Sequence, residues 1–207
     1  MASQEMFRRF IGIDYSGAKF ASSPLKSLRI YESILGKTGK VATEVRLCKT
    51  SQKYWSRCDI AKWLVNELGA STTTTTLVAI DHGFSFPFCY FEKYQLPLNW
   101  HYFLDDFSHH WPTDNNDVSV RRLRKETKSS KVRLRTGDSK WRRVCERRVG
   151  AKSVFHFDVP GSVATSTHAG IPWLRYLRQN LPDNIHFWPF DGWNPPKGKK
   201  ILTQALK

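Results

Sequence analysis

The sequence predicts an α/β protein in which helices flank one mixed β-sheet. Its 207 residues, of which 40% are hydrophobic, are enough to bury a full core in a single domain. Three strand-like segments with short, turn-rich links come first, and helix-like and strand-like segments alternate after them. This order, βββ-α-β-α with further α and β units, is typical of a mixed sheet covered by helices.

The three N-terminal strands are expected at residues 7–14, 28–35 and 42–47. FRRFIGID is apolar and β-branched and runs into a Tyr-Ser-Gly-Ala turn, LRIYESIL alternates before two glycines, and ATEVRL follows. Short links between neighbouring strands favour antiparallel pairing. We therefore expect an antiparallel meander.

The middle of the chain predicts two helices and one buried strand. Ser56 and Asp59 have the spacing of a capping box, and Gly69 is expected to close the helix that follows. The apolar run at 77–80 fits a central strand. A second helix is expected over 100–111, where aromatic and apolar residues recur at helical spacing after Asn99 as N-cap.

The C-terminal third is expected to hold strands at 154–159 and 185–190, with helical structure over 161–181 that Pro172 interrupts. Residues 197–207 show no strong signal for either structure. No internal repeat is found.

Charge is concentrated in one segment. Residues 121–152 contain 14 Lys and Arg and three acids, so they carry +11 of the net charge of +15. Such a field attracts a polyanion such as nucleic acid, although a solvated basic loop has the same composition. We expect a basic insertion at about 118–152 within a single domain spanning 1–207.

Several classes of protein are disfavoured by the composition. No apolar run has the length of a membrane span, and the N-terminus lacks the pattern of a secretory signal. The four cysteines form no CxxC pair, which argues against a zinc ribbon. Four cysteines in a chain of 207 residues do not indicate a disulfide framework. We therefore expect a cytoplasmic protein without a membrane partner.

Two acids occupy matching positions. Asp14 follows the strand FIGI and Asp81 follows the strand LVAI, and each precedes a turn of small residues. Carboxylates at adjacent strand ends can bind Mg²⁺ or Mn²⁺, and such ions activate water for phosphodiester cleavage. The alternative is that each aspartate only caps its turn.

The segments FIGIDYSGA, YWSRCDIAKWL, LVAIDHGFSFP, WPTD, KSVFHFDVPGSVATSTHAGIPWLR and HFWPFDGW resemble an uncharacterised bacterial family of predicted nucleases with a ribonuclease H-like fold. The resemblance covers about residues 9–193. It implies that Asp14 lies on the first strand and Asp81 on the fourth, the usual places of two metal-binding acids in that fold.

The sequence departs from the family after the WPFDGW motif. The resemblance implies a further strand with a glutamate in a V-E-x-Y-P-like motif and then a helix, whereas residues 198–207 contain no acid, tyrosine or proline. We therefore expect the final strand, the helix and a third acidic ligand to be missing, as in a truncated or degenerate copy.

Two further groups have alternative interpretations. His101, Asp105 and His109 lie at i, i+4 and i+8 on a helix, but two helical turns span about 12 Å, so a solvated face is preferred over a metal site. The small residues from Gly161 to His168 could present backbone N–H groups to a phosphate, or simply cap and pack a helix.

The leading interpretation is a metal-dependent phosphodiesterase acting on nucleic acid, with Asp14 and Asp81 as catalytic and metal-binding residues and Mg²⁺ or Mn²⁺ as cofactor. The alternative is a non-catalytic nucleic-acid-binding protein that uses residues 121–152. A phosphotransferase-like site between the two aspartate turns ranks third, because DYSGAK is a weak match to a phosphate loop. Possible accessory residues are Ser16, His82, Ser162 and His168. The candidate nucleic-acid contacts are Arg121, Arg122, Arg124, Lys125, Arg133, Arg135, Lys140, Trp141, Arg142 and Arg143.

Overall fold

The computed structural model describes residues 7–36, 41–48, 52–70, 74–129, 135–181, 183, 185–196, 198 and 200–205. The chain divides into two compact units. Residues 1–15, 24–81 and 180–207 form what we call the sheet unit, and residues 16–23 and 82–179 form the helical unit.

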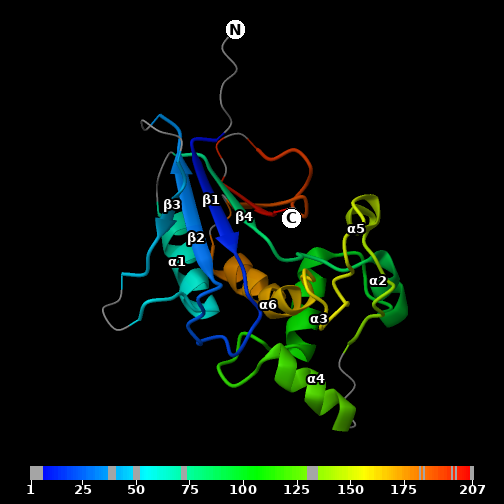
Figure 1. Cartoon of the computed structure of the whole chain (residues 1–207). Helices are drawn as coiled ribbons and strands as arrows, with labels where there is room; N and C mark the ends of the chain where they lie inside the picture. Colours follow the sequence, from blue (N-terminus) through cyan, green and yellow to red (C-terminus); the bar gives the residue numbers. More distant parts are fainter. Residues whose placement is uncertain are drawn as a thin grey trace. The chain divides into compact units, whose positions relative to one another are not determined.

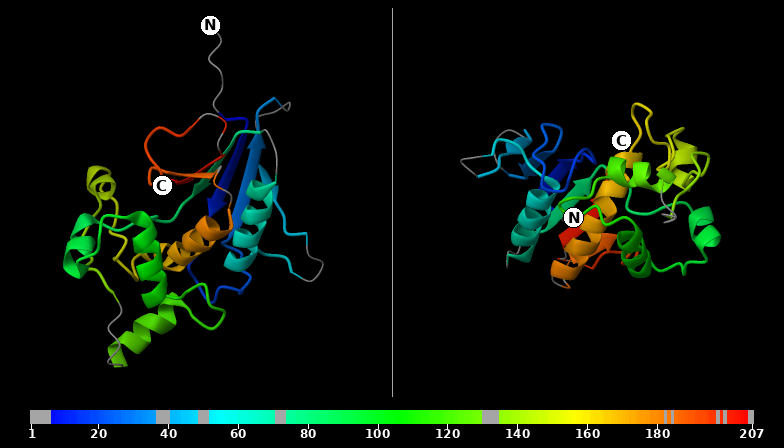
Figure 2. Two further views of the ribbon diagram at one scale, coloured as in Figure 1. Left: turned by 180° about the vertical axis from the view of Figure 1, so that it is seen from behind. Right: turned by 90° about the horizontal axis from the view of Figure 1, so that it is seen from below.

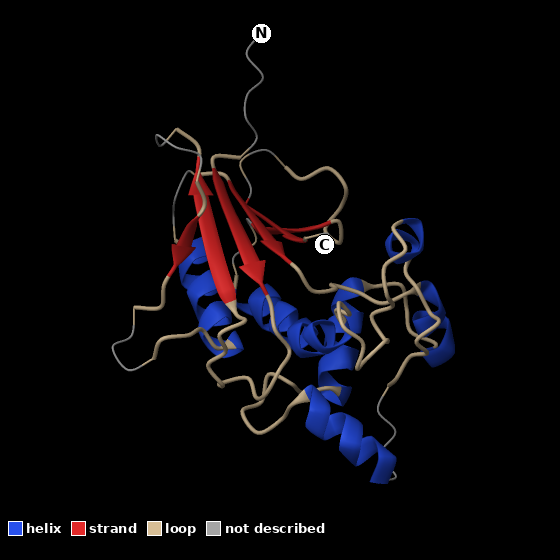
Figure 3. Ribbon diagram, viewed as in Figure 1, coloured by secondary structure: helices blue, strands red, loops and turns tan. Residues whose placement is uncertain are grey.

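The sheet unit contains a six-stranded mixed sheet (Figure 3). Strands β2 and β3 pair antiparallel to their neighbours, whereas β1, β4, β6 and β5 run parallel to one another. The strand order is β3-β2-β1-β4-β6-β5. The predicted α/β class and mixed sheet are therefore confirmed. The strands are β1 (Arg9–Asp14), β2 (Arg29–Ile34), β3 (Thr43–Val45), β4 (Thr76–Ile80), β5 (Ile185–Trp188) and β6 (Lys200–Gln204).

Helix α1 (Arg57–Gly69) lies against one face of this sheet (Figure 1). It begins as the sequence predicts, because the Ser56 hydroxyl accepts a hydrogen bond from Asp59 N and the Asp59 carboxylate accepts one from Ser56 N. Its buried face includes Ile60, Leu64 and Leu68, which recur at helical spacing.

The tail forms a strand, which corrects the expectation that the final strand is missing. Strand β6 pairs with β4 on one side and with β5 on the other. The sequence contains little sign of this strand, because it begins with Lys200, a charged residue that the fold buries. The Lys200 ammonium donates hydrogen bonds of 2.7 Å to the carbonyl oxygens of Leu68 and Ala70. Both carbonyls lie at the C-terminal end of α1. The side chain of Lys200 in β6 therefore caps this helix, whereas the sequence predicts that Gly69 closes it.

The helical unit contains five helices among its described residues, joined by longer loops (Figure 2). Two of them, α4 and α5, lie in the segment that was expected to be a basic insertion. The helices are α2 (Phe88–Tyr94), α3 (Trp100–His110), α4 (Val120–Ser129), α5 (Val144–Arg148) and α6 (Ala164–Asn180), of which Asn180 belongs to the sheet unit. The expected N-cap of α3 is confirmed, since the Asn99 side chain accepts a hydrogen bond from Tyr102 N.

The strand expected at 154–159 is wrong. Asp158 has a φ of 61°, a left-handed conformation that no strand accommodates. The alternating aromatic residues at this place serve a cluster instead, with Phe155 stacked on Tyr90 and Phe157 in contact with His168. An alternating pattern alone could not separate these two outcomes.

Helix α6 continues through Pro172 and is not broken there. A proline inside a helix removes the N–H that would bond to the carbonyl four residues earlier, which here belongs to His168. The Thr113 hydroxyl donates a hydrogen bond of 3.0 Å to that carbonyl oxygen. Thr113 is fully buried, so the WPTD motif replaces the lost helical hydrogen bond with a side chain.

None of the helices in the described part of the chain has both the length and the hydropathy of a membrane span. Cys58 and Cys89 are half-buried, and all four cysteines are free.

Replacing Lys200 by methionine should lower the free energy of unfolding by about 2–4 kcal/mol, because two carbonyl oxygens at the end of α1 lose their donor. Lys62→Met, at an exposed position on the same helix, should change it by less than about 0.5 kcal/mol. Urea denaturation followed by circular dichroism measures both variants. Equal stability of the two would show that the ammonium does not cap α1.

Candidate functional site

The two candidate acids lie at the ends of adjacent parallel strands. Strands β1 and β4 pair in the register Ile13↔Ile80, and Asp81 N donates a hydrogen bond to Ile13 O, which carries the ladder one step further. Asp14 and Asp81 therefore occupy neighbouring positions at the carboxyl edge of the sheet. Neighbouring register positions project to the same face of a sheet, which is the arrangement that the sequence predicts for them.

The two carboxylates differ in environment. Asp14 is exposed, whereas Asp81 retains only 9% of its accessible surface. Asp81 Oδ1 accepts a hydrogen bond of 2.8 Å from the backbone N–H of Tyr15. This bond ties the end of β4 to the turn after β1 and fixes the orientation of the Asp81 carboxylate.

A buried tyrosine–arginine pair lies beneath this edge, and the sequence did not reveal it. Tyr15 follows Asp14 directly, and Arg57 is the first residue of α1; both are buried. Burial raises the pKa of Tyr15 and lowers the pKa of Arg57, and the two groups lie close enough to influence each other. Arg57 brings a guanidinium into the interior of the same unit that holds both aspartates.

The donor set at this edge suits a hard divalent cation held by few protein ligands. Mg²⁺ commonly binds through one or two carboxylates, keeps several waters and takes further oxygens from substrate phosphates. No cluster of three His, Cys, Asp or Glu suited to a metal occurs within the described ranges. In the register of β4 and β6, the position beside Asp81 belongs to Ala205, whose N–H donates to Ile80 O. Gln204, just before it, is the register partner of Ile80 and therefore projects to the face of the sheet opposite to Asp81.

Cations continue the same row across the sheet. Asp14 is the antiparallel partner of Arg29 in β2. The β2–β3 register pairs Ile30 with Val45, so Arg46 stands opposite Arg29. Reading from the β3 edge, the row is Arg46, Arg29, Asp14 and Asp81, so Asp14 adjoins Arg29 directly.

The glycine of the DYSGAK motif has a packing role. A Cβ on Gly17 would lie 2.1 Å from the carbonyl oxygen of Thr165, so only glycine allows this close approach of two backbone segments within the helical unit. The neighbouring Ser16 hydroxyl accepts a hydrogen bond of 3.4 Å from Ala18 N. These contacts favour a tight packed turn over a phosphate loop.

His82 and Ser162 also have structural partners in the helical unit. The His82 ring is buried against Gly170 of α6, and its Nδ1 lies 2.9 Å from Gly83 O. The Ser162 hydroxyl accepts a hydrogen bond from Ala164 N at the start of α6. The capping interpretation of this segment accounts for that contact.

His168 is buried in an aromatic cluster. Its ring contacts five aromatic side chains of the helical unit, and its Nδ1 lies 2.9 Å from Ala164 O, one helical turn earlier. Nε2 has no hydrogen-bond partner among the described atoms. Burial lowers the pKa of His168 to about 3, so the ring is neutral at physiological pH. The surrounding rings are those of Phe86, Phe107, Trp111, Phe155 and Phe157.

The His101, Asp105 and His109 group on α3 does not converge on one point. Asp105 forms an ion pair of 2.5 Å with Arg175 of α6, and Arg178 lies 3.4 Å from His101 Nε2. All three side chains are exposed, as the solvated-face interpretation expects, and Asp105 and His101 also contact arginines of α6.

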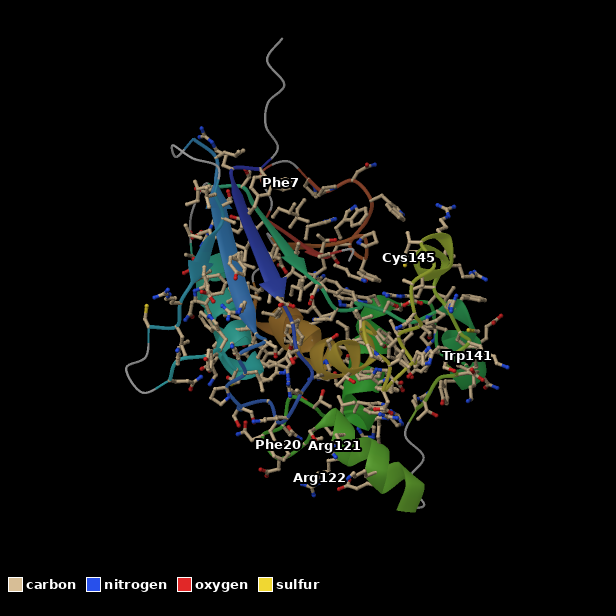
Figure 4. All side chains as sticks on the ribbon, viewed as in Figure 1. Phe7, Phe20, Arg121, Arg122, Trp141 and Cys145 are labelled. Atoms are coloured by element: carbon tan, nitrogen blue, oxygen red, sulfur yellow. The ribbon has the colours of Figure 1, made fainter. Side chains whose placement is uncertain are left out.

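The basic segment has exposed and paired cations. Arg121 and Arg122 extend from α4 (Figure 4), and Arg122 pairs with Glu126 on the same helix. Arg124 pairs with Asp158 and lies over the Phe157 ring. The exposed cations for which the described residues supply no ion pair are Arg121, Lys125, Lys140, Arg142, Arg147 and Arg148.

Other members of the segment anchor it to the helical unit. Arg135 pairs with Asp106 at 2.8 Å and Arg143 pairs with Glu146 at 2.9 Å. Trp141 is half-buried and has Lys93 5.2 Å from its ring centroid. Arg133 lies outside the described residues.

Comparison of the chain with protein-family models, with curated proteins and with solved structures found no match. The function proposed below therefore depends on the residues themselves and on the resemblance described above.

The buried His168 should make stability depend on pH. The unfolded chain binds the imidazole proton at a pKa of about 6.5, whereas the folded state binds it only near 3, so stability falls as the pH drops below about 6.5. Lowering the pH from 7 to 5 should therefore reduce the free energy of unfolding by about 2 kcal/mol through this histidine. His168→Asn should remove that loss in urea denaturation, whereas the exposed His101→Asn should keep it. An NMR titration in which the His168 ring of the wild type protonates near pH 6.5 would contradict the assignment.

Proposed function

We propose that this chain is a metal-dependent phosphodiesterase of ribonuclease H-like type that acts on nucleic acid, with Asp14 and Asp81 as the metal-binding residues. The observation that carries the proposal is the β1–β4 register, which brings both aspartates to neighbouring positions at one sheet edge. A divalent ion bound by two adjacent carboxylates offsets their mutual repulsion, and it binds through oxygen ligands of this kind.

The residues of the chain have distinct roles in this proposal. Asp81, oriented by Tyr15 N–H, and the exposed Asp14 bind the cation, which would supply Lewis-acid activation of a water and of the scissile phosphate. Arg29 is the cross-strand neighbour of Asp14, and in this proposal it attracts the phosphate backbone of the substrate. No cluster of three His, Cys, Asp or Glu side chains suited to a metal occurs within the described ranges, so we expect a slow enzyme.

Asp14→Asn and Asp81→Asn should each lower Mn²⁺-dependent cleavage of a labelled oligonucleotide by about a hundredfold or more, because each removes a charged ligand. Mn²⁺ binding, measured by electron paramagnetic resonance without substrate, should weaken in both variants. Asp117→Asn replaces an exposed aspartate of the helical unit and should leave both measurements unchanged. Cleavage that persists in Asp14→Asn would refute the site.

A second candidate function is nucleic-acid binding without catalysis through residues 121–152. The specific observation that favours it is the group of exposed cations on α4 and around α5, which have no acidic partner within the described ranges. Ion pairs already compensate Arg124, Arg135 and Arg143, so the exposed group, and not the whole segment, would contact phosphates.

The double variant Arg121→Gln/Arg142→Gln should weaken binding to single-stranded DNA and reduce the slope of log K against log salt by about 1.4, because two phosphate contacts are lost. The variant Arg8→Gln/Lys62→Gln removes the same charge at exposed positions of the sheet unit and serves as the control. Fluorescence anisotropy at several salt concentrations measures both. Equal slopes for the two variants would mean that net charge alone determines binding.

A further inference from the structure

A basic pocket lies in the sheet unit, whereas the segment with the highest charge belongs to the helical unit. It has a cavity volume of about 480 Å³, within the range of small-molecule sites. It is formed by the start of β2, the end of β3 and the segment that leads into α1. The lining residues are Lys26, Arg29, Glu44, Arg46, Lys53 and Tyr54.

The charge of the pocket is strongly positive. Four cations and one acid line it, and the acid, Glu44, is bound to Arg29 at 2.6 Å. The β2–β3 ladder ends at the pair Ile30↔Val45, so Arg29 and Arg46 are the next positions along the two segments, and like charges at opposed positions are unfavourable. A bound anion would offset this repulsion.

Hydrogen bonds join the three segments that form the pocket, and these bonds do not involve the charged side chains of its lining. Trp55 Nε1 donates to Val45 O at 3.0 Å, which joins the segment before α1 to β3. Leu25 N donates to Trp55 O at 2.9 Å, which joins the same segment to the approach to β2. The three walls therefore have a fixed spacing, and little ordering is required when a ligand binds.

An aromatic ring accompanies the cations. Tyr54 is half-buried, and the Lys53 ammonium lies 5.6 Å from its ring centroid. Gln52 Nε2 donates to Tyr54 O at 2.8 Å and also to the Asp59 carboxylate, so the backbone that carries the ring is fixed. A cation beside a ring suits a ligand that combines phosphate with a planar base.

We propose that this pocket binds a nucleoside phosphate unit, with Arg46, Lys26 and Lys53 contacting the phosphates and Tyr54 stacking on the base. The unit is either a free nucleotide or part of a nucleic-acid strand, since both present the same chemistry. The assignment does not depend on catalysis at Asp14 and Asp81, because its contacts need no metal; Arg29 is the one side chain that lines the pocket and also belongs to the proposed catalytic row.

Titration calorimetry of the full chain at low salt in EDTA, with ADP and with pyrophosphate, tests the proposal. ADP should bind, and more tightly than pyrophosphate, because the base adds stacking. Arg46→Gln and Lys53→Gln should each weaken ADP binding by about threefold to tenfold, whereas Lys62→Gln should not change it. Tyr54→Leu should weaken ADP binding and leave pyrophosphate binding unchanged.

Glu44→Gln should change ADP affinity in the opposite direction, and a gain of affinity cannot result from misfolding. It removes the one acid of the lining and releases Arg29, so ADP affinity should rise by about threefold. A short thymidine strand, titrated against the same variants, distinguishes the two sources. If Arg46→Gln weakens the strand as well as ADP, the pocket holds a strand; if it weakens ADP alone, the ligand is a free nucleotide.

No heat of ADP binding at millimolar concentration would overturn the proposal, as would ADP binding that is indifferent to Arg46→Gln and Lys53→Gln. Equal affinity for ADP and pyrophosphate would exclude the nucleoside part. Because EDTA removes divalent ions, loss of metal-dependent cleavage in the Asp14 and Asp81 variants leaves this result unaffected, and the two proposals can fail separately.

Discussion

The parallel hydrogen-bonded ladder between β1 and β4 is the constraint on which the candidate site depends. It joins two segments that are more than sixty positions apart in sequence and ends with Asp81 N bonded to Ile13 O. From this ladder follow the adjacency of Asp14 and Asp81 and the position of Tyr15 N–H against the Asp81 carboxylate. A slip of one residue would turn every side chain of β4 to the opposite face and separate the two acids.

Part of this site could be predicted from the sequence because its information is local. An apolar strand followed by an acid and a small-residue turn occurs twice, and parallel pairing then brings the acids to one edge. The buried Arg57 could not be anticipated, because it follows an ordinary helix cap and its burial depends on tertiary packing. The basic pocket was missed for a similar reason, since Lys26, Arg46 and Lys53 become neighbours only through the β2–β3 register and the Trp55 hydrogen bond.

The fold was predicted best where the pattern was strong and capped, and worst where a tertiary partner decides the conformation. The helix after Ser56 and the first four strands lie close to their expected bounds. Residues 154–159 alternate like a strand, yet a left-handed Asp158 and an aromatic cluster override that pattern. Pro172 predicted a break, and the buried Thr113 hydroxyl, far away in sequence, compensates it. Local propensity describes neighbouring residues only, so it cannot predict a contact made by a residue far away in the sequence.

The position of β6 between β4 and β5 has a consequence for how the chain is made. Strand β4 ends at residue 80, whereas β6 begins at residue 200, so a ribosome needs on the order of ten seconds to supply the partner of β4. During that interval the growing chain exposes the β4 edge, with its apolar residues, as a template for unwanted pairing. Final closure of the sheet also delivers Lys200 to the end of α1, so helix capping and strand insertion occur in one late event. Chaperone dependence of the nascent chain would follow from topology alone.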